Sequence, residues 1–327
     1  MKKARIKGIE YYLPEMVATN DDLASELPNW TADKIRDKIG IEKRHIAAPT
    51  ECASDLAEKA VRKLFAKRIC TPEEVEFILF CTQSPDYFLP TTACLLQERL
   101  GIPTTVGALD FNLGCSGYVY GLSLAKGLIE TEQVDNVLLI TAETYSKFID
   151  PKDASVRTIF GDGAAATFIS AEETKEDFIG PFVFGTDGAG KDKLIVKNGG
   201  MRSFGELDDG KRQLFMNGPA IVSFTIKVVP ETVNTLLAKS QLSISDIDHF
   251  VFHQANEFML SNLRSKMSIP KEKFHIDLKD YGNTVSSTIP IVLSNLIARG
   301  MINRDMSRVM LVGFGVGYSW GSVLLYL

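Results

Sequence analysis

An internal repeat constrains the fold more than any other feature of the sequence. The run VEFILFCTQSP from Val75 resembles IDHFVFHQANE from Ile247, and NVLLITAETYS, with Val137, resembles RVMLVGFGVGYS, with Val309. Both pairs are 172 residues apart. Each run is apolar and rich in β-branched residues before it breaks into a polar turn, which is typical of a strand in a sheet covered on both faces. The chain is therefore expected to fold as two related α/β units.

A third pair of segments lies between these strands. DFNLGCSGYVYGLSLAKGLI and DYGNTVSSTIPIVLSNLIARG are both turns of small residues that open an apolar helix. The charged segment AEETKED from Ala171 serves as the junction, so we expect an N-terminal half at 1–173 and a C-terminal half at 174–327. Helices are predicted at 53–67 and 219–240.

Composition excludes several classes of function. The chain has 36 Lys plus Arg against 41 Asp plus Glu, a net charge of −5, so a general nucleic-acid binder is not expected. Its 5 cysteines are dispersed without a CxxC pair, which argues against a disulfide framework or a zinc site and indicates the cytoplasm. Glu10 interrupts the N-terminal apolar run, so we expect no export. The glycine-rich stretch 309–327 is predicted to form two strands around a turn, so no membrane span is expected there.

Cys115 is the strongest candidate nucleophile. It lies between Gly114 and Gly117, where an apolar run ends and a helix is predicted to begin. The N–H groups and dipole of a helix N-terminus stabilise a thiolate and can lower a cysteine pKa to roughly 3.5–7.5. The alternative is a small buried cysteine that fills a tight helix start.

Two of the four histidines, His249 and His253, have an HxxxH spacing. On a helix this would indicate a metal pair, but IDHFVFH reads as a strand, in which four residues span about 13 Å. His253 ends that strand and is expected to lie at the sheet edge, where loops carry function. It is either a functional group or a hydrogen-bonded edge histidine.

Asn283 follows a glycine in YGNTVSSTIP, a position at which Asn is usually a turn or cap residue. In the internal alignment it lies close to the counterpart of Cys115. Two such helix starts meeting at the centre of the molecule would bring Cys115, His253 and Asn283 together.

At this point several motifs resemble a known family. The motifs are GCSGY at Cys115, HQAN at His253, GNTVSSTIP at Asn283, FGDGAAA from Phe160, GIEKRHIAAP from Gly40 and the terminal GFGVGYSWGS. Over nearly the whole chain they are similar to a β-ketoacyl-acyl carrier protein synthase III. The resemblance implies a thiolase-like α/β fold, with two pseudo-symmetric halves in a five-layered arrangement, and gives Cys115, His253 and Asn283 the catalytic roles.

The resemblance implies a decarboxylative Claisen condensation in fatty acid or specialised acyl or polyketide biosynthesis. An acyl group from acyl-coenzyme A or an acyl-carrier protein would be held on Cys115, and a malonyl-type thioester on a carrier protein would be the second substrate. His253 and Asn283 would donate hydrogen bonds to that thioester, and the N–H groups of Cys115 and Val316 would form an oxyanion hole. No metal or other cofactor is implied.

Some positions depart from the family pattern. Val316 stands where the family has glycine, which narrows the pocket. Lys34 and Ala154 replace the tryptophan and arginine that sandwich the coenzyme A adenine, so the nearby Trp30 and Arg157 are expected to substitute for them.

The helix after HQAN departs as well. Phe258 replaces a carrier-docking arginine, and with Asn256 it is expected to bind substrate. Docking is then assigned to other basic residues: Arg264, Lys266, Lys211 and Arg212.

A homodimer is implied too, with the segment 84–92 near the two-fold axis and Leu89 reaching the partner's acyl pocket. The alternatives are an acyltransferase that passes the acyl group from Cys115 to a non-malonyl acceptor without decarboxylation, and a non-catalytic thiolase-fold partner subunit. The intact Cys, His and Asn set favours condensation. A dinucleotide-binding protein is excluded because no helix can follow GFGVG so close to residue 327.

Overall fold

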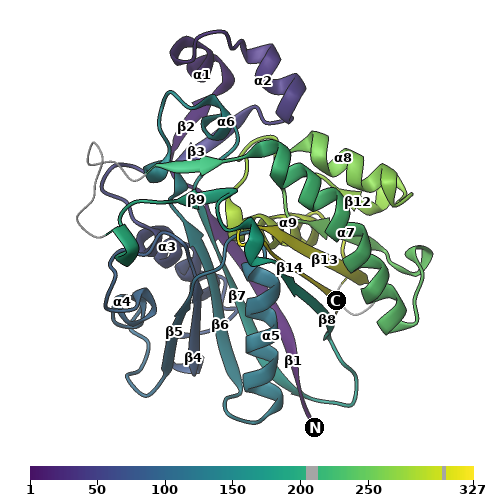
Figure 1. The fold of residues 1–327 in the computed structure, drawn as a ribbon. Coiled ribbons are helices and arrows are strands. Elements are labelled where there is room, and N and C mark those ends of the chain that lie inside the picture. The colour runs from purple at the N-terminus through teal and green to yellow at the C-terminus, as the bar shows by residue number, and fades with distance from the viewer. Residues whose placement is uncertain (204–212, 304–306) are drawn as a thin grey trace.

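The computed structural model describes residues 1–203, 213–303 and 307–327, so the predicted docking residues Lys211 and Arg212 lie outside the described residues. Two five-stranded sheets form its framework (Figure 1). The first sheet has the order β1 (Lys2–Tyr12), β7 (Gly163–Glu173), β6 (Asn136–Glu143), β4 (Phe77–Cys81) and β5 (Gly107–Phe111). The second has the order β8 (Ile179–Thr186), β14 (Ser319–Tyr326), β13 (Arg308–Gly315), β11 (His249–Phe252) and β12 (Phe274–His275).

The two sheets have the same topology. In each, the central strand (β6 or β13) pairs in parallel with one neighbour (β4 or β11) and antiparallel with the other (β7 or β14). That second neighbour pairs antiparallel with the edge strand (β1 or β8). Strands β6 and β13 begin and end 172 residues apart, as do the first residues of β4 and β11. The repeat read from the sequence is therefore a structural repeat.

Helices cover both sheets and fill the space between them. Helices α3 (Ala53–Ala66) and α4 (Thr92–Arg99) pack on the first sheet, and α7 (Gly218–Ser240) packs on the second beside α8 (Glu257–Lys266). Helices α5 (Gly117–Glu130) and α9 (Thr288–Ala298) contact strands of both sheets and form the central layer (Figure 1). The order helix, sheet, helix, sheet, helix confirms the predicted five layers, and α3 and α7 confirm the two predicted helices.

Smaller elements complete the described part of the chain. They are β2 (Met16–Thr19), α1 (Asn20–Glu26), α2 (Ala32–Ile39), β3 (Lys43–Ile46), α6 (Ala154–Arg157), β9 (Leu194–Val196), β10 (Leu214–Met216) and the 3-10 turns η1 (Pro72–Glu74), η2 (Tyr145–Phe148), η3 (Gly188–Gly190), η4 (Met201–Ser203), η6 (Ile244–Asp246), η7 (Lys271–Lys273) and η8 (Val285–Ser287). Strand β7 ends at Glu173 and β8 begins at Ile179, so the boundary between 173 and 174 remains our proposed division.

Helix α7 is, among the described helices, the one long and apolar enough to cross a membrane. Asn217 caps its first turn by accepting the N–H of Ala220 at 3.1 Å, and its buried residues include Phe224, Val229 and Val233. These side chains pack against the second sheet in the hydrophobic core, which is the pattern of a core helix.

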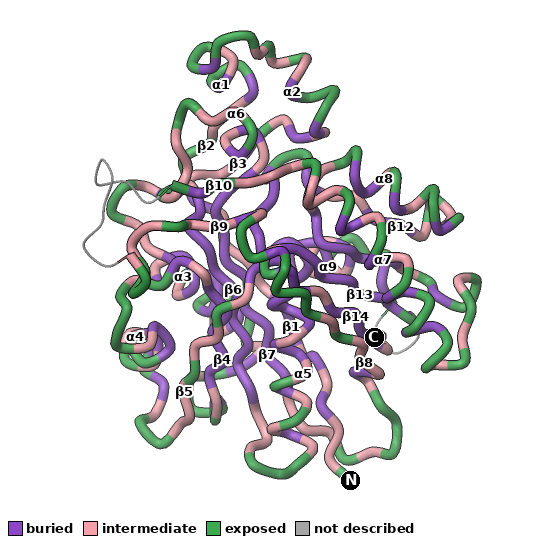
Figure 2. The backbone as a smooth tube through the Cα atoms, viewed as in Figure 1, coloured by how far each residue is buried: buried purple, intermediate pink, exposed green. Residues whose placement is uncertain are grey.

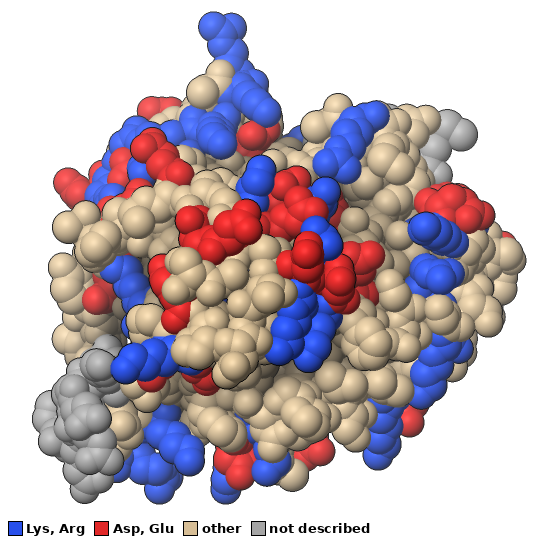
Figure 3. All heavy atoms as spheres, turned by 90° about the horizontal axis from the view of Figure 1, so that it is seen from above, with Lys and Arg blue, Asp and Glu red and all other residues tan. Residues whose placement is uncertain are grey.

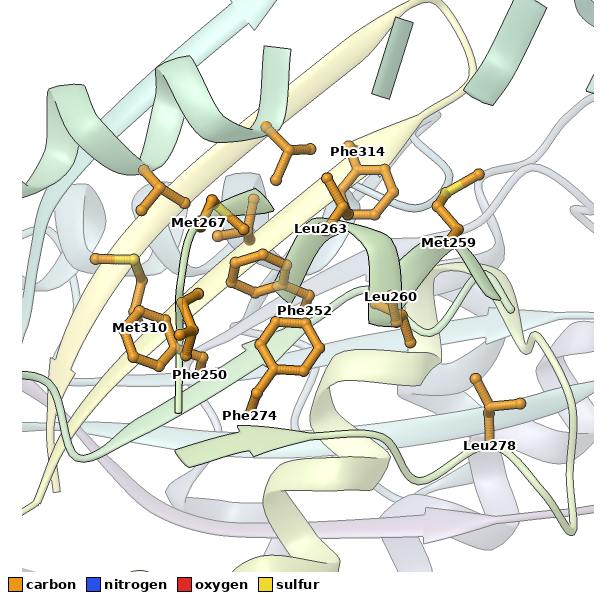
Figure 4. Packing of buried hydrophobic residues seen from close by; sticks show 14 of the residues in the cluster. Phe250, Phe252, Met259, Leu260, Leu263, Met267, Phe274, Leu278, Met310 and Phe314 are labelled. Carbon is orange, nitrogen blue, oxygen red and sulfur yellow. The ribbon is translucent and has the colours of Figure 1, made fainter. Parts of the chain in front are cut away.

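The core on this side of the second sheet is aromatic (Figure 4). Phe252 packs edge-on against Phe250 and Phe274, with centroids 6.4 Å and 4.9 Å apart, and Leu260 and Leu263 of α8 cover them. Burial follows the strands and the central helices (Figure 2). Packed aromatic side chains thus reach Phe252, the last residue of β11, which His253 follows.

Candidate active site

Three loops, each next to a different helix or strand, converge on one cavity of about 100 Å³. Cys115 lies just before α5, His253 follows β11 directly, and Asn283 precedes η8 and α9. All three side chains line this cavity and all three residues are buried. The remaining lining residues are mostly apolar: Ile159, Phe160, Leu194, Met216, Gly218, Ile221, Val222, Ala255, Asn256, Met259, Phe314 and Gly315. The structure therefore brings together the three residues that the sequence singled out.

The electrostatics of Cys115 differ from the prediction. Burial raises the pKa of its thiol to about 12, the nearby carboxyl group of Glu143 adds to this, and hydrogen bonds from the N–H groups of Cys115 and Val316 act in the opposite direction. The predicted lowering is therefore wrong for this closed pocket, because desolvation outweighs the helix N-terminus. Cys115 rests as a thiol and needs an acceptor for its proton when it attacks.

His253 is held by the loop that also carries Asn283. Its Nδ1 lies 2.8 Å from Thr288 Oγ1, and that hydroxyl lies 3.1 Å from the Val285 carbonyl. Phe314 packs edge-on against the ring, with centroids 5.5 Å apart. Burial lowers the pKa of His253 to about 3, with a hydrogen bond to the Val285 carbonyl opposing it. The ring is therefore neutral at pH 7, with Nδ1 occupied and Nε2 left for a ligand or for the thiol proton.

Asn283 is fixed through both its main chain and its side chain. Its N–H donates to the Ile159 carbonyl at 3.0 Å, and its Oδ1 accepts the N–H of Val285 at 2.8 Å. With Oδ1 occupied, the NH2 group is the end of the amide available to a ligand in the cavity.

Through its main chain, Val285 contacts both His253 and Asn283. It is buried and has a φ of +56°, a left-handed conformation that is rare for a β-branched residue. This conformation directs its N–H to Asn283 and its carbonyl toward Thr288 and His253. Strain of this kind persists where the surrounding structure fixes the residue, as it does at functional sites. Val285 and Thr288 both lie in the motif GNTVSSTIP, but their roles were missed, because neither a positive φ nor a contact between residues 35 positions apart can be read from the sequence.

Val316 and Gly315 form the wall beside the nucleophile. A Cβ on Gly315 would lie 2.9 Å from Cys115 Sγ, so glycine is needed there for space. The Val316 N–H donates to the thiol, and its side chain packs beside Gly114. The N–H groups of Cys115 and Val316 thus both lie beside the sulfur, where an acyl carbonyl would have to approach. The described residues contain no group of three or more His, Cys, Asp or Glu side chains that could hold a metal ion.

Comparisons with known proteins agree with this geometry. Models for the 3-oxoacyl-[acyl-carrier-protein (ACP)] synthase III family and its C-terminal region match residues 109–188 and 237–327. A β-ketoacyl-[acyl-carrier-protein] synthase III of Streptococcus gordonii is 34% identical over 327 residues, covering 99% of each chain, and one of Lactococcus lactis is 34% identical over 329 residues, covering 100% of each.

The chain belongs to the β-ketoacyl-acyl carrier protein synthase III family.

Solved structures agree. A crystal structure of a 3-oxoacyl-(acyl-carrier-protein) synthase III is 52% identical, with a TM-score of 0.97 over 99% of this chain and 100% of that one. The enzyme of Burkholderia xenovorans is 35% identical, with a TM-score of 0.92 over 100% of this chain and 95% of that one. The protein is therefore a condensing acyltransferase with the thiolase fold, as its motifs predicted.

The other residues that the family resemblance singled out have different surroundings. Asn256 lines the cavity and caps α8 by accepting the Met259 N–H at 2.8 Å. Phe258 is 62% exposed on the same helix. Trp30 is half-buried, with the ammonium groups of Lys34 and Lys38 over its ring at 4.9 and 5.5 Å.

Three predicted cationic residues are tied into the structure. Arg157 forms an ion pair with Glu26 at 3.4 Å. Arg264 donates to the Ile269 carbonyl at the end of its own helix, at 3.1 Å, and Lys266 donates to the Ile226 carbonyl of α7, at 2.9 Å. A carrier protein or coenzyme A would have to compete with these contacts.

Proposed function

We propose that this enzyme loads an acyl group from a thioester onto Cys115 and condenses it with a malonyl-type thioester carried by an acyl carrier protein. The observation that supports this most strongly is the meeting of Cys115, His253 and Asn283 in one buried cavity. The names of the relatives, which are synthases of β-ketoacyl-acyl carrier protein, point to the same reaction.

In the first half-reaction the sulfur of Cys115 attacks the carbonyl carbon of the acyl thioester. The thiol proton passes to the neutral His253 ring and then to the departing thiolate, so that a free thiol leaves. The N–H groups of Cys115 and Val316 stabilise the negative oxygen that forms on the carbonyl.

In the second half-reaction His253 and Asn283 hold the carbonyl of the malonyl thioester. The bond between its α-carbon and its carboxylate breaks, carbon dioxide leaves, and the electron pair remains as an enolate. The Asn283 NH2 group donates to the enolate oxygen. The neutral His253 ring donates from Nε2 in the tautomer in which its Nδ1 accepts the Thr288 hydroxyl. The α-carbon then attacks the acyl carbonyl, and the Cys115 thiolate departs.

The quaternary structure belongs to the proposal too. Tyr87, Phe88 and Leu89 follow one another on the loop after β4, and Leu89 is 78% exposed. Three adjacent exposed apolar side chains are unusual on a monomer surface. We assign this loop to the interface of a homodimer, with Leu89 at the partner's acyl pocket, and we place the enzyme in the cytoplasm.

The test is intact mass spectrometry after incubation with acyl-coenzyme A and acyl-carrier thioesters. We expect an acyl adduct in the wild type and none in Cys115→Ala, with Cys94→Ala as the matched control because Cys94 is an exposed cysteine away from the cavity. Adding malonyl-carrier protein to the loaded enzyme should discharge the adduct and release carbon dioxide. Failure of every thioester to form an adduct would refute the proposal, and discharge by other acceptors without carbon dioxide would establish simple acyl transfer instead.

A further inference from the structure

Arg44 is a fully buried cation that the proposed reaction does not use. It belongs to the motif GIEKRHIAAP and lies on β3, where its exposed fraction is 0%. Its guanidinium group donates to the Thr158 carbonyl and to Asn20 Oδ1, both at 2.7 Å, and makes a longer contact of 3.5 Å with the Ala18 carbonyl. All three acceptors are uncharged. Within the described part of the chain, its Nε has no hydrogen-bond partner.

Stability alone does not account for an arginine at this position. Burial first and the neighbouring Arg157 second lower the pKa of Arg44 to about 10, so the side chain is still charged at pH 7. Moving a charge from water into the interior without an opposite charge beside it is unfavourable, whereas an apolar side chain of similar size would be stabilising there. The role of Arg44 must therefore lie in what its hydrogen bonds hold.

One of these bonds reaches the segment that fixes Asn283. The Ile159 carbonyl accepts the Asn283 N–H at 3.0 Å, and the Gly161 N–H donates to the Asn283 carbonyl, also at 3.0 Å. These two bonds form an isolated parallel bridge. Thr158 directly precedes Ile159, so the hydrogen bond from Arg44 acts one residue away from the contact that holds Asn283.

The stem of Arg44 packs against both sides of the same bridge. A Cβ on Gly161 would lie 3.2 Å from Arg44 Cβ, and a Cβ on Gly282, the residue before Asn283, would lie 3.4 Å from the same atom. Gly282 has a φ of +69°, a left-handed conformation that suits glycine, and it turns the chain into Asn283. Arg44 therefore lies directly against the turn that presents Asn283 to the cavity.

The second strong bond of the guanidinium group fixes the arginine itself. Asn20, its acceptor, is buried at the start of α1. The Asn20 side chain donates to the Ile41 carbonyl at 2.8 Å, and its N–H donates to the Glu42 carbonyl at 3.1 Å. Because the acceptor is itself held by hydrogen bonds, the position of the Arg44 guanidinium is well defined.

We propose that Arg44 is a positioning residue for condensation, and that its bond to Thr158 holds Asn283 where the amide can donate to the malonyl thioester. This rests on the proposed function, because it requires a malonyl thioester in the cavity. Among the described residues, none of the Arg44 hydrogen bonds goes to Cys115 or His253. Acylation of Cys115 therefore depends much less on Arg44 than condensation does.

The experiment measures the two half-reactions separately in the wild type, Arg44→Met and Arg44→Lys. Intact mass spectrometry follows single-turnover acylation of Cys115 by acetyl- and butanoyl-coenzyme A and by the corresponding carrier thioesters. Release of carbon dioxide from saturating malonyl-carrier protein follows condensation. Both Arg44 substitutions are also made in the Asn283→Ala background, and thermal unfolding of each variant is recorded.

Arg99→Met is the matched control. Arg99 is a partly buried arginine of α4 that donates to Ser54, Asp55 and Glu58 of α3, and it does not line the catalytic cavity. Its loss should lower stability without changing the ratio of the two rates.

We expect Arg44→Met to slow condensation about tenfold or more and to leave acylation within about threefold of wild type, because a small displacement of a group that contacts the reacting atoms is enough to slow a step. Arg44→Lys should show a smaller loss of the same kind, because one ammonium group cannot replace both strong bonds. In the Asn283→Ala background neither substitution should slow condensation further, since the residue through which Arg44 acts is gone.

A merely structural arginine would give other results. Equal losses in both steps, or a further tenfold loss of condensation in the Asn283→Ala background, would overturn the positioning role and leave the proposed function intact. A folded Arg44→Met that condenses at the wild-type rate would overturn it too. If Arg44→Met does not fold, the ratio of the two rates in Arg44→Lys decides. If none of the thioesters acylates the wild type, the proposed function falls and the positioning role with it.

Discussion

At the scale of single residues, a substitution of Asn283 is expected to affect the second half-reaction and not the first. Its Oδ1 accepts the Val285 N–H, so its NH2 group is the end that can hold the malonyl carbonyl. We predict that Asn283→Ala leaves the acylation of Cys115 within a few-fold of wild type and slows condensation about 100-fold or more, the usual effect of losing one such donor. Mass spectrometry of the adduct and release of carbon dioxide measure the two steps.

The matched control is Asn234→Ala. This asparagine is exposed on α7 and does not line the catalytic cavity, so neither step should change. Equal losses in loading and condensation in Asn283→Ala would contradict the assigned role.

Single residues were predictable where a motif carries them. Cys115, His253 and Asn283 each end a recognisable turn, so the sequence located them. The pKa of Cys115 was not predictable, because the sequence shows the helix that follows but not the depth of burial or the carboxyl group of Glu143. Glu143 itself is fully buried, and burial raises its pKa to about 8 against hydrogen bonds from Ser84, Gln83 and Ser286.

At the scale of elements, a histidine pair joins two strands of the second sheet. His249 of β11 and His275 of β12 lie side by side, with Nδ1 of the first 2.9 Å from Nε2 of the second. Burial lowers the pKa of both. That of His275 falls to about 4, through burial first and the neighbouring His249 second. Asp248 and Lys273 face His249, and Asp277 and Arg299 face His275.

This pair predicts a pH dependence of stability. The unfolded chain takes up a proton on His275 near pH 6.5, whereas the folded protein does so only near pH 4. The contribution of His275 is therefore complete above about pH 6.5 and falls by about 1.4 kcal/mol per pH unit down to pH 4. Urea unfolding of wild type and His275→Gln across this range should show the shallower slope in the variant. Parallel curves would contradict the prediction.

Elements were predictable where the repeat defines them. The repeat strands β4, β6, β11 and β13 and the helices α3 and α7 followed from apolar runs and their turns, and 309–327 forms β13 and β14 as expected. The cavities were not predictable, because they depend on contacts such as Tyr145 with Gln83. These residues lie near the ends of two of the repeat segments, but the sequence does not show that they meet across 62 positions.

At the scale of the whole molecule, the net charge of −5 bears on the carrier protein, which the family resemblance implies as a partner. Figure 3 looks down on the end that carries α1, α2 and α8, and there Lys and Arg are interspersed with Asp and Glu. Arg264 and Lys266 are already bonded to main-chain carbonyls, whereas Phe258 is exposed on the same helix. If the carrier protein binds at α8, we expect its binding to depend on apolar contact with Phe258 as well as on charge. Its affinity should then fall only moderately as the salt concentration rises.

The last prediction concerns the exposed loop after β4. If Tyr87, Phe88 and Leu89 lie in a dimer interface, a charge placed there must lose its hydration when the subunits meet. We predict that Leu89→Lys shifts the enzyme from dimer to monomer in size-exclusion chromatography with light scattering at micromolar concentration. Met301→Lys is the control, since Met301 is another exposed apolar residue, 47% accessible, far along the chain from this loop. A monomeric wild type would remove the interface from the proposal. A dimeric Leu89→Lys would place the interface elsewhere. If the variant is a monomer as predicted, Cys115 acylation measured on the same sample shows whether the acyl site needs the partner subunit.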